Sequence, residues 1–190
     1  YLFNNRIASM SDNVAGMKEL LEYIYSRGHR KIAYIHGAMS AVTSGRLSSF
    51  YRTAERLGLE IQDEYIRGAA YRATTTTYRV TNELLDLPNP PTCIIYPDDF
   101  ASFGGINAIR QRGLQIPEDI SVAGYDGIQA ARQLEPRLTT VQQDTEQIGC
   151  LAARELISLI ERPKTTIIEQ VIVPGKVAEG KSVARIPTDN

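Results

Sequence analysis

The segment of residues 120–160 constrains the fold of this 190-residue chain more than any other. It begins with an apolar run at 120–125, continues through the extended stretch PRLTTVQQD, and ends in an amphipathic pattern over Thr145–Glu161. The apolar run predicts a buried central strand. Asp126 follows this strand at its carboxyl end, where open α/β sheets place ligand-contacting groups. We therefore expect a strand, a crossing and a long helix, with Asp126 at a binding site.

Strand and helix patterns alternate along the rest of the chain. Ser11 and Asp12 are good N-cap residues, and apolar residues follow them at helical spacing until Gly28. We predict four strands, at 31–36, 65–68, 92–96 and 120–125. We also predict five helices. The first ends at Gly28, the second includes Leu47 and ends before Gly58, the third spans 74–87, the fourth runs from an Asp99 cap to Gly113, and the fifth spans 145–161. This alternation predicts an α/β fold with a mostly parallel sheet and helices on both faces.

Composition excludes several classes of protein. The chain is 43% hydrophobic and 23% charged, which is typical of a globular domain, and its net charge of -1 argues against a nucleic-acid-binding surface. No run approaches the roughly 20 apolar residues that a bilayer requires. Cys93 and Cys150 are expected to be buried thiols in a reducing compartment. The first three residues resemble the middle of a strand and lack an initiator methionine, so we expect a fragment of a longer protein.

Motifs for the common enzyme classes are missing from the sequence. There is no nucleophile elbow, phosphate-binding loop, dinucleotide fingerprint or zinc-protease motif. A glycoside-hydrolase pair of Asp98 and Asp126 remains conceivable, because their separation is not fixed by the sequence. His29 is expected to make a structural hydrogen bond, and His36 could line a cleft at a strand end. We expect no enzyme, no catalytic residues, no metal site and no cofactor.

Polar side chains gather where the predicted strands end. If those strands are parallel neighbours, one edge of the sheet collects residues 40–46, Tyr71, Asp98 and Asp126. Carboxylates accept hydrogen bonds from hydroxyl groups, an arginine donates in a fork, and an aromatic ring covers an apolar face. The set suits a polyhydroxyl ligand such as a sugar or a nucleoside-like molecule.

Four segments of the chain resemble the LacI/GalR transcriptional regulators. They are SDNVAGMKELLEYIYSRGHRKIAYIHG, SGRLSSFYRTAERLGLEI, YPDDFASFGGINAIRQRGLQIPEDISVAGYDG and PRLTTVQQDTEQIGCLAARELISLI. The tail VIVPGKVAEGKSVAR resembles the closing strand of the family, with a departure at 175–180. Together these segments cover nearly all of the chain.

The resemblance implies a periplasmic-binding-protein-like fold. In that fold, two α/β lobes, each a parallel sheet flanked by helices, are joined by three crossings, here expected near 8–12, 139–142 and 173–174. Residues 11–140 with 174–190 would form the carboxyl-terminal lobe. Residues 1–10 with 141–173 would be the remaining part of an incomplete amino-terminal lobe. The DNA-binding headpiece of the family is expected to be absent from this chain.

The resemblance also implies ligand contacts. Arg46 matches the arginine that holds effector oxygens, Asp126 matches the effector-contacting acid, and Asp98 matches a position that faces the ligand in sugar-responsive members. Tyr71 lies near the stacking aromatic, with Phe100 and Tyr125 as alternatives. Val42 and Ser40 fall at positions of polar contacts in some members, although Val42 has no polar side-chain atom. The implied ligand-binding residues are Arg46, Asp98, Asp126, Tyr71, Phe100 and Val42.

The function that the resemblance implies is that of a cytoplasmic, homodimeric repressor. This chain would be its effector-binding and dimerisation region, with Leu57 and Phe103 as contributors to the dimer. Its partners would be a small polar effector, most of all a sugar, and operator DNA, which the missing headpiece would bind; no membrane partner is expected. The alternative is a periplasmic sugar-binding protein of an ABC transporter, which shares the fold.

Overall fold

The computed structural model of the protein describes residues 8–163 and 170–187. Its strands form two sheets. The larger sheet has six strands in the order β3-β2-β4-β5-β6-β8, and the smaller sheet pairs β1 with β7. The pairs from β3 to β6 are parallel, and only β8 runs antiparallel to its neighbour β6. The strands are β1 (Ala8–Ser11), β2 (Ile32–His36), β3 (Ile66–Gly68), β4 (Cys93–Ile95), β5 (Ser121–Asp126), β6 (Thr139–Gln142), β7 (Gln170–Val173) and β8 (Lys176–Ala178).

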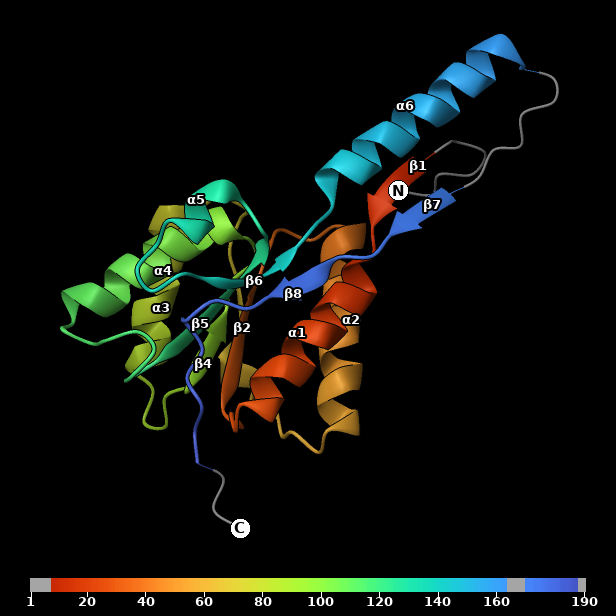
Figure 1. Ribbon diagram of the computed structural model, residues 1–190. Helices are drawn as coiled ribbons and strands as arrows, with labels where there is room; N and C mark the ends of the chain where they lie inside the picture. Colours follow the sequence, from red (N-terminus) through yellow and green to blue (C-terminus); the bar gives the residue numbers. More distant parts are fainter. Residues whose placement is uncertain (1–7, 164–169, 188–190) are drawn as a thin grey trace.

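Helices cover both faces of the larger sheet, as the alternation predicts. Figure 1 shows α1 and α2 on one face and α3 and α4 on the other, while α6 extends away from the sheet beside β1 and β7. The helices are α1 (Asn13–Ser26), α2 (Ala41–Arg56), α3 (Thr74–Leu85), α4 (Asp99–Gln111), α5 (Gln129–Arg132) and α6 (Thr145–Glu161), with a 3-10 turn η1 (Asp63–Tyr65). The α/β architecture with a largely parallel sheet is confirmed.

The two faces of the larger sheet enclose separate apolar cores. Alternate residues of β2 point to opposite faces, so Ile32 and Tyr34 pack under α1 and α2 while Ala33 and Ile35 pack under α3 and α4. The same alternation holds in β4, where Cys93 and Ile95 belong to the first core and Ile94 to the second. The sheet is therefore buried on both sides, which explains the nearly continuous apolar runs of its central strands.

Local signals in the sequence fix several helix ends. Asp12 is the N-cap of α1, and its carboxylate accepts a hydrogen bond from the Ala15 amide at 2.8 Å. Gly28 follows the helix with a φ of 96°, a conformation that glycine adopts without steric cost. The bounds of α6 also agree with the predicted range.

Two expectations about local structure are wrong. The helix that contains Arg46 and Leu47, α2, begins at Ala41 behind the N-cap Ser40, whose hydroxyl accepts from the Thr43 amide. Tyr65 lies in the 3-10 turn and not in β3. Cys93 is buried as expected, but Cys150 is exposed, because α6 has no buried residue.

The smaller sheet lies where the chain passes between the predicted lobes. β1 pairs with β7 along its length, and α6 packs against both strands. Ser11 pairs with Val173 in this sheet, whereas Val141 and Gln142 pair within the larger sheet. The strand pairing thus shows that the chain leaves the larger sheet after Gln142. The assignment of residues to two lobes remains a prediction.

No helix within residues 8–163 and 170–187 is both long enough and apolar enough to cross a membrane.

Close packing of α3 against α4 generates a stability prediction. A Cβ atom at Gly104 would lie 1.9 Å from the Thr74 carbonyl oxygen, so Gly104→Ala forces the two helices apart. We expect a loss of roughly 1–3 kcal/mol in the free energy of unfolding, measured by urea titration. The matched control is Gly149→Ala in α6, where nothing lies within 4 Å of the added methyl group. The control should gain up to about 1 kcal/mol from helix propensity. Equal effects of the two substitutions would contradict the packing argument.

Candidate ligand site

The candidate site lies at the carboxyl edge of the larger sheet. The chain leaves β2 for β3 on one side and returns to β4 on the other, so the direction of strand addition reverses at β2. Such a switch point leaves a crevice between the segments that follow the two strands. Arg46 belongs to α2, which follows β2, and Asp98 follows β4. Asp126 ends β5, the next strand in the sheet.

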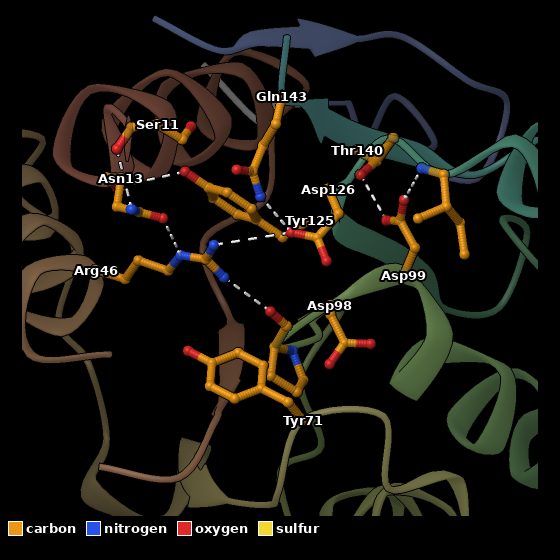
Figure 2. Close-up of polar contacts among 12 residues, drawn as sticks. Ser11, Asn13, Arg46, Tyr71, Asp98, Asp99, Tyr125, Asp126, Thr140 and Gln143 are labelled. Atoms are coloured by element: carbon orange, nitrogen blue, oxygen red, sulfur yellow. Dashed lines mark hydrogen bonds and ion pairs between the residues drawn. The ribbon is translucent and has the colours of Figure 1, made fainter. Parts of the chain in front are cut away.

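Arg46 is held in the second turn of α2 with its side chain buried. Only 4% of its surface is exposed, so Arg46 is not a solvated surface residue. Its Nε donates to Asn13 Oδ1 at 2.8 Å, and its Nη1 donates to the Pro97 carbonyl at 2.9 Å. The guanidinium carbon lies 3.5 Å from the centroid of the Tyr125 ring, in a cation–π contact. These contacts fix the guanidinium in one orientation (Figure 2).

Asp126 faces Arg46 from the end of β5. Its Oδ1 lies 3.9 Å from Arg46 Nη2, and 36% of its side-chain surface is exposed. Its backbone has a φ of 117°, which costs a non-glycine residue about 1–3 kcal/mol. The side-chain amide of Gln143 donates to the same Oδ1, and the Gln143 backbone N–H donates to the Asp126 carbonyl at 3.1 Å. The carboxylate is therefore held in place yet open to a ligand.

The expected roles of Asp98 and Asp99 at the start of α4 are partly reversed. Asp98 is the N-cap, because its Oδ1 accepts from the Ala101 amide at 2.7 Å, and Asp99 does not cap the helix. The other oxygen of Asp98 accepts from the Arg72 amide at 2.8 Å. Asp98 is also buried, with 3% of its surface exposed. It therefore ties the loop that contains Tyr71 to the helix.

Asp99 points away from Arg46 into the interior. Its Oδ1 accepts from the Thr140 hydroxyl, and its Oδ2 accepts from the Ile128 amide at 2.8 Å. The residue is fully buried. It joins α4 to β6 and to the segment after β5, so its role is to connect elements of the larger sheet.

Tyr71 lies beside the same crevice, in the loop between β3 and α3. Its ring packs flat on the backbone of Gly37, where a Cβ atom would lie 2.3 Å from the ring. Its hydroxyl is 2.9 Å from Thr43 Oγ1. Since Thr43 donates its own proton to the Ala38 carbonyl, Tyr71 is the donor in this pair. Figure 2 shows the Tyr71 ring close to Arg46 and Asp98. The side chain of Tyr71 is half-buried.

Comparison with known proteins places this geometry in a family. The family described as "periplasmic binding protein-like domain" matches this chain over residues 21–183, which is most of its length. The chain belongs to this family. The expected periplasmic-binding-protein-like fold is thereby confirmed.

Curated members related to this chain are named as regulators. This chain is 34% identical over 180 residues to a probable HTH-type transcriptional repressor, ExuR, of Bacillus subtilis strain 168. The match covers 94% of this chain and 54% of the relative. It is also 34% identical to the HTH-type transcriptional repressor PurR of Serratia proteamaculans, covering 87% of this chain and 48% of the relative. The chain thus spans about half the length of these relatives. Both are named as repressors, and neither is named as an enzyme.

Solved structures of LacI-type periplasmic binding protein-like domains superpose well on the chain. A LacI transcriptional regulator from Bacillus cereus subsp. cytotoxis has a TM-score of 0.88 at 27% identity, over 95% of this chain and 64% of that one. A LacI family regulator from Enterococcus faecium, solved with bound ribose, has a TM-score of 0.85 at 23% identity, over 95% of this chain and 66% of that one. The resemblance to LacI-family regulators is confirmed.

The remaining predicted site residues differ in their surroundings. Tyr125 is fully buried beneath Arg46, so its ring is not available to stack on a ligand. Phe100 is 46% exposed at the start of α4, with its ring centroid 5.5 Å from that of Phe103. Val42 is 40% exposed and lines a pocket of about 530 Å³ next to β1. Ser40 is occupied as the cap of α2. Ligand contact by Phe100 and Val42 stays a prediction.

Sequence reasoning missed three groups that contact the ion pair. They are Asn13, the Pro97 carbonyl and Gln143. Asn13 is the first residue of α1, and its amide also donates to the Ser11 carbonyl at 3.1 Å. The signal that could have found the two amides is their position, because each lies directly beside one of the predicted crossings.

Both histidines lie outside the Arg46–Asp126 contact. His29 is buried and makes a structural hydrogen-bond pair, as expected: its ring lies 2.9 Å from Thr92 Oγ1 and 3.2 Å from the Ala184 carbonyl. Burial lowers the pKa of His29 to about 4, so it is neutral at physiological pH. His36 makes a 2.8 Å contact with the Gly37 carbonyl. In the two described ranges, no group of His, Cys, Asp and Glu residues is arranged to hold a metal ion.

Burial also shifts the acids of this periplasmic binding protein-like domain. Burial raises the pKa of Asp126, while the Arg46 guanidinium lowers it and the charge of Asp98 raises it further. Burial raises the pKa of Asp99 from 3.8 to about 7, although the hydrogen bonds from Thr140 and Ile128 favour its charged form. A pKa of about 7 makes the charge of Asp99 sensitive to changes of pH near neutrality.

The raised pKa of Asp99 predicts a pH-dependent stability. The folded state binds the proton more tightly than the unfolded state, so this stabilisation is complete below pH 3.8 and is lost as the pH rises through about 7. Asp99→Asn does not titrate, and its amide can still accept from Ile128 and donate to Thr140. Relative to wild type, the variant should gain at most about 1.4 kcal/mol per pH unit across that window, measured by urea titration. A constant difference between the two proteins would contradict this assignment.

Proposed function

We propose that the chain is the effector-binding region of a LacI/GalR-type transcriptional regulator, a repressor that senses a small polar ligand and most of all a sugar. The main support is the geometry of Arg46 and Asp126. A buried, oriented guanidinium faces a partly exposed carboxylate across 3.9 Å at the switch point of the sheet. The repressor names of the curated relatives favour a regulator over a transport receptor.

The chemistry of the pair suits neighbouring hydroxyl groups. Arg46 uses Nε and one Nη1 hydrogen for Asn13 and Pro97, so hydrogens on Nη1 and Nη2 are still available to a ligand oxygen. Asp126 retains lone pairs that accept from a hydroxyl. A hydroxyl group both donates and accepts, so two adjacent hydroxyls can satisfy both residues. The opposite charges of Arg46 and Asp126 balance each other, which favours a neutral polyhydroxyl ligand over a strongly charged one.

The other expected contacts would shape the ligand pocket. In this proposal Tyr71 offers its ring to an apolar face of the sugar, and Asp98 holds the Tyr71 loop through the Arg72 amide. Phe100 and Val42 would line the pocket with exposed apolar surface. Asp98 acts through the loop in this arrangement more than through a free carboxylate, because backbone amides occupy both of its oxygens.

The remaining parts of the proposal concern the whole protein. We infer that it acts in the cytoplasm as a homodimer, with Leu57 and Phe103 as contributors to the dimer, and that a headpiece outside these residues binds operator DNA. Residues 11–140 with 174–190 would form one lobe, and the rest would belong to the other. The ligand would change the balance between two lobe arrangements through its different affinity for each, without a chemical reaction.

The proposal predicts a ligand-dependent stabilisation that requires both charged residues. A thermal-shift screen of the full-length protein against sugars, sugar acids and nucleosides should give a hit, because a ligand at about 100 times its Kd stabilises by roughly 2.7 kcal/mol. Arg46→Ala and Asp126→Asn should each weaken binding of that hit by about 2 kcal/mol, or roughly thirtyfold. The control is Arg52→Ala on the exposed side of the same helix. Unchanged binding by the first two variants would disprove the site.

A further inference from the structure

Two amide side chains contact the ion pair from opposite ends, and both lie where the chain passes between the two sheets. Asn13 follows β1 of the smaller sheet, with only Asp12 between them. Gln143 follows β6 of the larger sheet and precedes α6, which packs on the smaller sheet. Each amide therefore belongs to a different connection between the sheets.

Each amide contacts one member of the pair. Asn13 accepts from Arg46 Nε at 2.8 Å while its own NH₂ group donates to the Ser11 carbonyl at 3.1 Å. Ser11 in turn pairs with Val173 in the smaller sheet. Gln143 donates to Asp126 Oδ1, the carboxylate oxygen nearest to Arg46. Two hydrogen bonds, from Asn13 to the Ser11 carbonyl and from Arg46 to Asn13, thus connect the end of β1 to Arg46.

These contacts explain why the pair does not close. Arg46 and Asp126 attract each other, and a direct bond between them would have a length of about 2.7–2.9 Å. Their closest atoms are instead 3.9 Å apart. Asn13 and the Pro97 carbonyl hold the arginine from behind, and Gln143 holds the nearer carboxylate oxygen. The remaining gap lets a ligand bind both charged groups without first breaking a direct hydrogen bond between them.

We propose that Asn13 and Gln143 are positioning residues that keep Arg46 and Asp126 at the separation that a ligand needs, and that they make this separation depend on the arrangement of the two sheets. This inference rests on the proposed function of the site. A hydrogen bond weakens steeply when its geometry departs from the ideal, so a rotation of the smaller sheet displaces Asn13 and alters the orientation of Arg46. Ligand affinity then differs between arrangements, which is the requirement for allosteric coupling.

The chain offers matched variants for a test. Asn13→Leu removes the contacts with both Arg46 and Ser11, whereas Asn13→Asp retains an acceptor for Arg46, loses the donor to Ser11 and adds a negative charge beside the guanidinium. Gln143→Met removes the side-chain bond to Asp126. Gln142→Met, at the preceding and exposed residue of the same connection, is the control. The N-cap Asp12 is unchanged in every variant, so α1 keeps its cap.

The affinity of the full-length protein is measured by calorimetry with three named probes: D-ribose, D-galactose and D-galacturonate. For whichever probe binds wild type most tightly, Asn13→Leu and Gln143→Met should each raise the Kd by about tenfold or more, as losses of supporting hydrogen bonds do at other sites. Asn13→Asp should have a smaller effect than Asn13→Leu, and Gln142→Met should leave the Kd unchanged.

A pH profile separates positioning from a general loss of structure. Gln143 is a neutral hydrogen-bond donor to Asp126, and the charged groups that act on Asp126 are Arg46 of α2, Asp98 and Asp99 at the start of α4, and Arg72 in the loop before α3. Gln143→Met removes a hydrogen bond that favours the ionised carboxylate. The pH below which binding weakens should therefore move upward in Gln143→Met and stay unchanged in Gln142→Met.

A measurement without ligand distinguishes failure of this inference from failure of the proposed function. In nitrogen-15-labelled protein, the Arg46 Nε–H should exchange with solvent faster in Asn13→Leu than in wild type, and Asn13→Asp should restore slow exchange. If none of the three probes binds wild type, the sugar assignment fails and this exchange measurement decides the role of Asn13. If a probe binds and Arg46→Ala abolishes binding while Asn13→Leu and Gln143→Met bind like wild type, the positioning role is disproved and the proposed function stands.

Discussion

The contact between the Arg46 guanidinium and the face of Tyr125 organises the carboxyl edge of the sheet. Through this single side chain, α2 is joined to β5 by the stacked ring, to α1 by Asn13, and to the end of β4 by the Pro97 carbonyl. A charge buried to this extent is stable only where its hydrogen-bonding hydrogens find partners. The need to satisfy Arg46 therefore fixes how four elements meet, and the same need leaves its outer hydrogens directed at the crevice.

The acids at this edge have different roles although they are chemically alike. Asp98 uses both oxygens on backbone amides and fixes a loop, Asp99 is buried between α4 and β6, and Asp126 alone combines a held oxygen with substantial exposure. Their surroundings therefore determine their roles. The unusual backbone of Asp126 fits this division, because strain of this kind is found where the rest of the structure holds a residue in place for a purpose.

Much of the fold could be predicted from the sequence, because helical and strand periods record which face of each element is buried. The sheet edge was also predictable, since parallel strands place their carboxyl ends together. The roles of Asp98 and Asp99 could not be separated from the sequence. If α4 began one residue later, Asp99 would be the N-cap and would no longer be the buried acid. Asn13 lies beside a predicted crossing, but its contact with Arg46 depends on how α1 packs against α2, which the sequence does not show. Cys150 was misplaced because an amphipathic pattern predicts burial without showing whether a covering element is present.

The exposed surface of α6 has a consequence for the energetics of binding. None of its residues is buried, and Leu156, Ile157 and Ile160 are each more than half exposed, so the described residues give this helix little packing of its own. Gln143 precedes α6 and is bonded to Asp126. A molecule bound at Asp126 is thus connected through Gln143 to the start of α6, so the position of this helix and occupancy of the site influence each other.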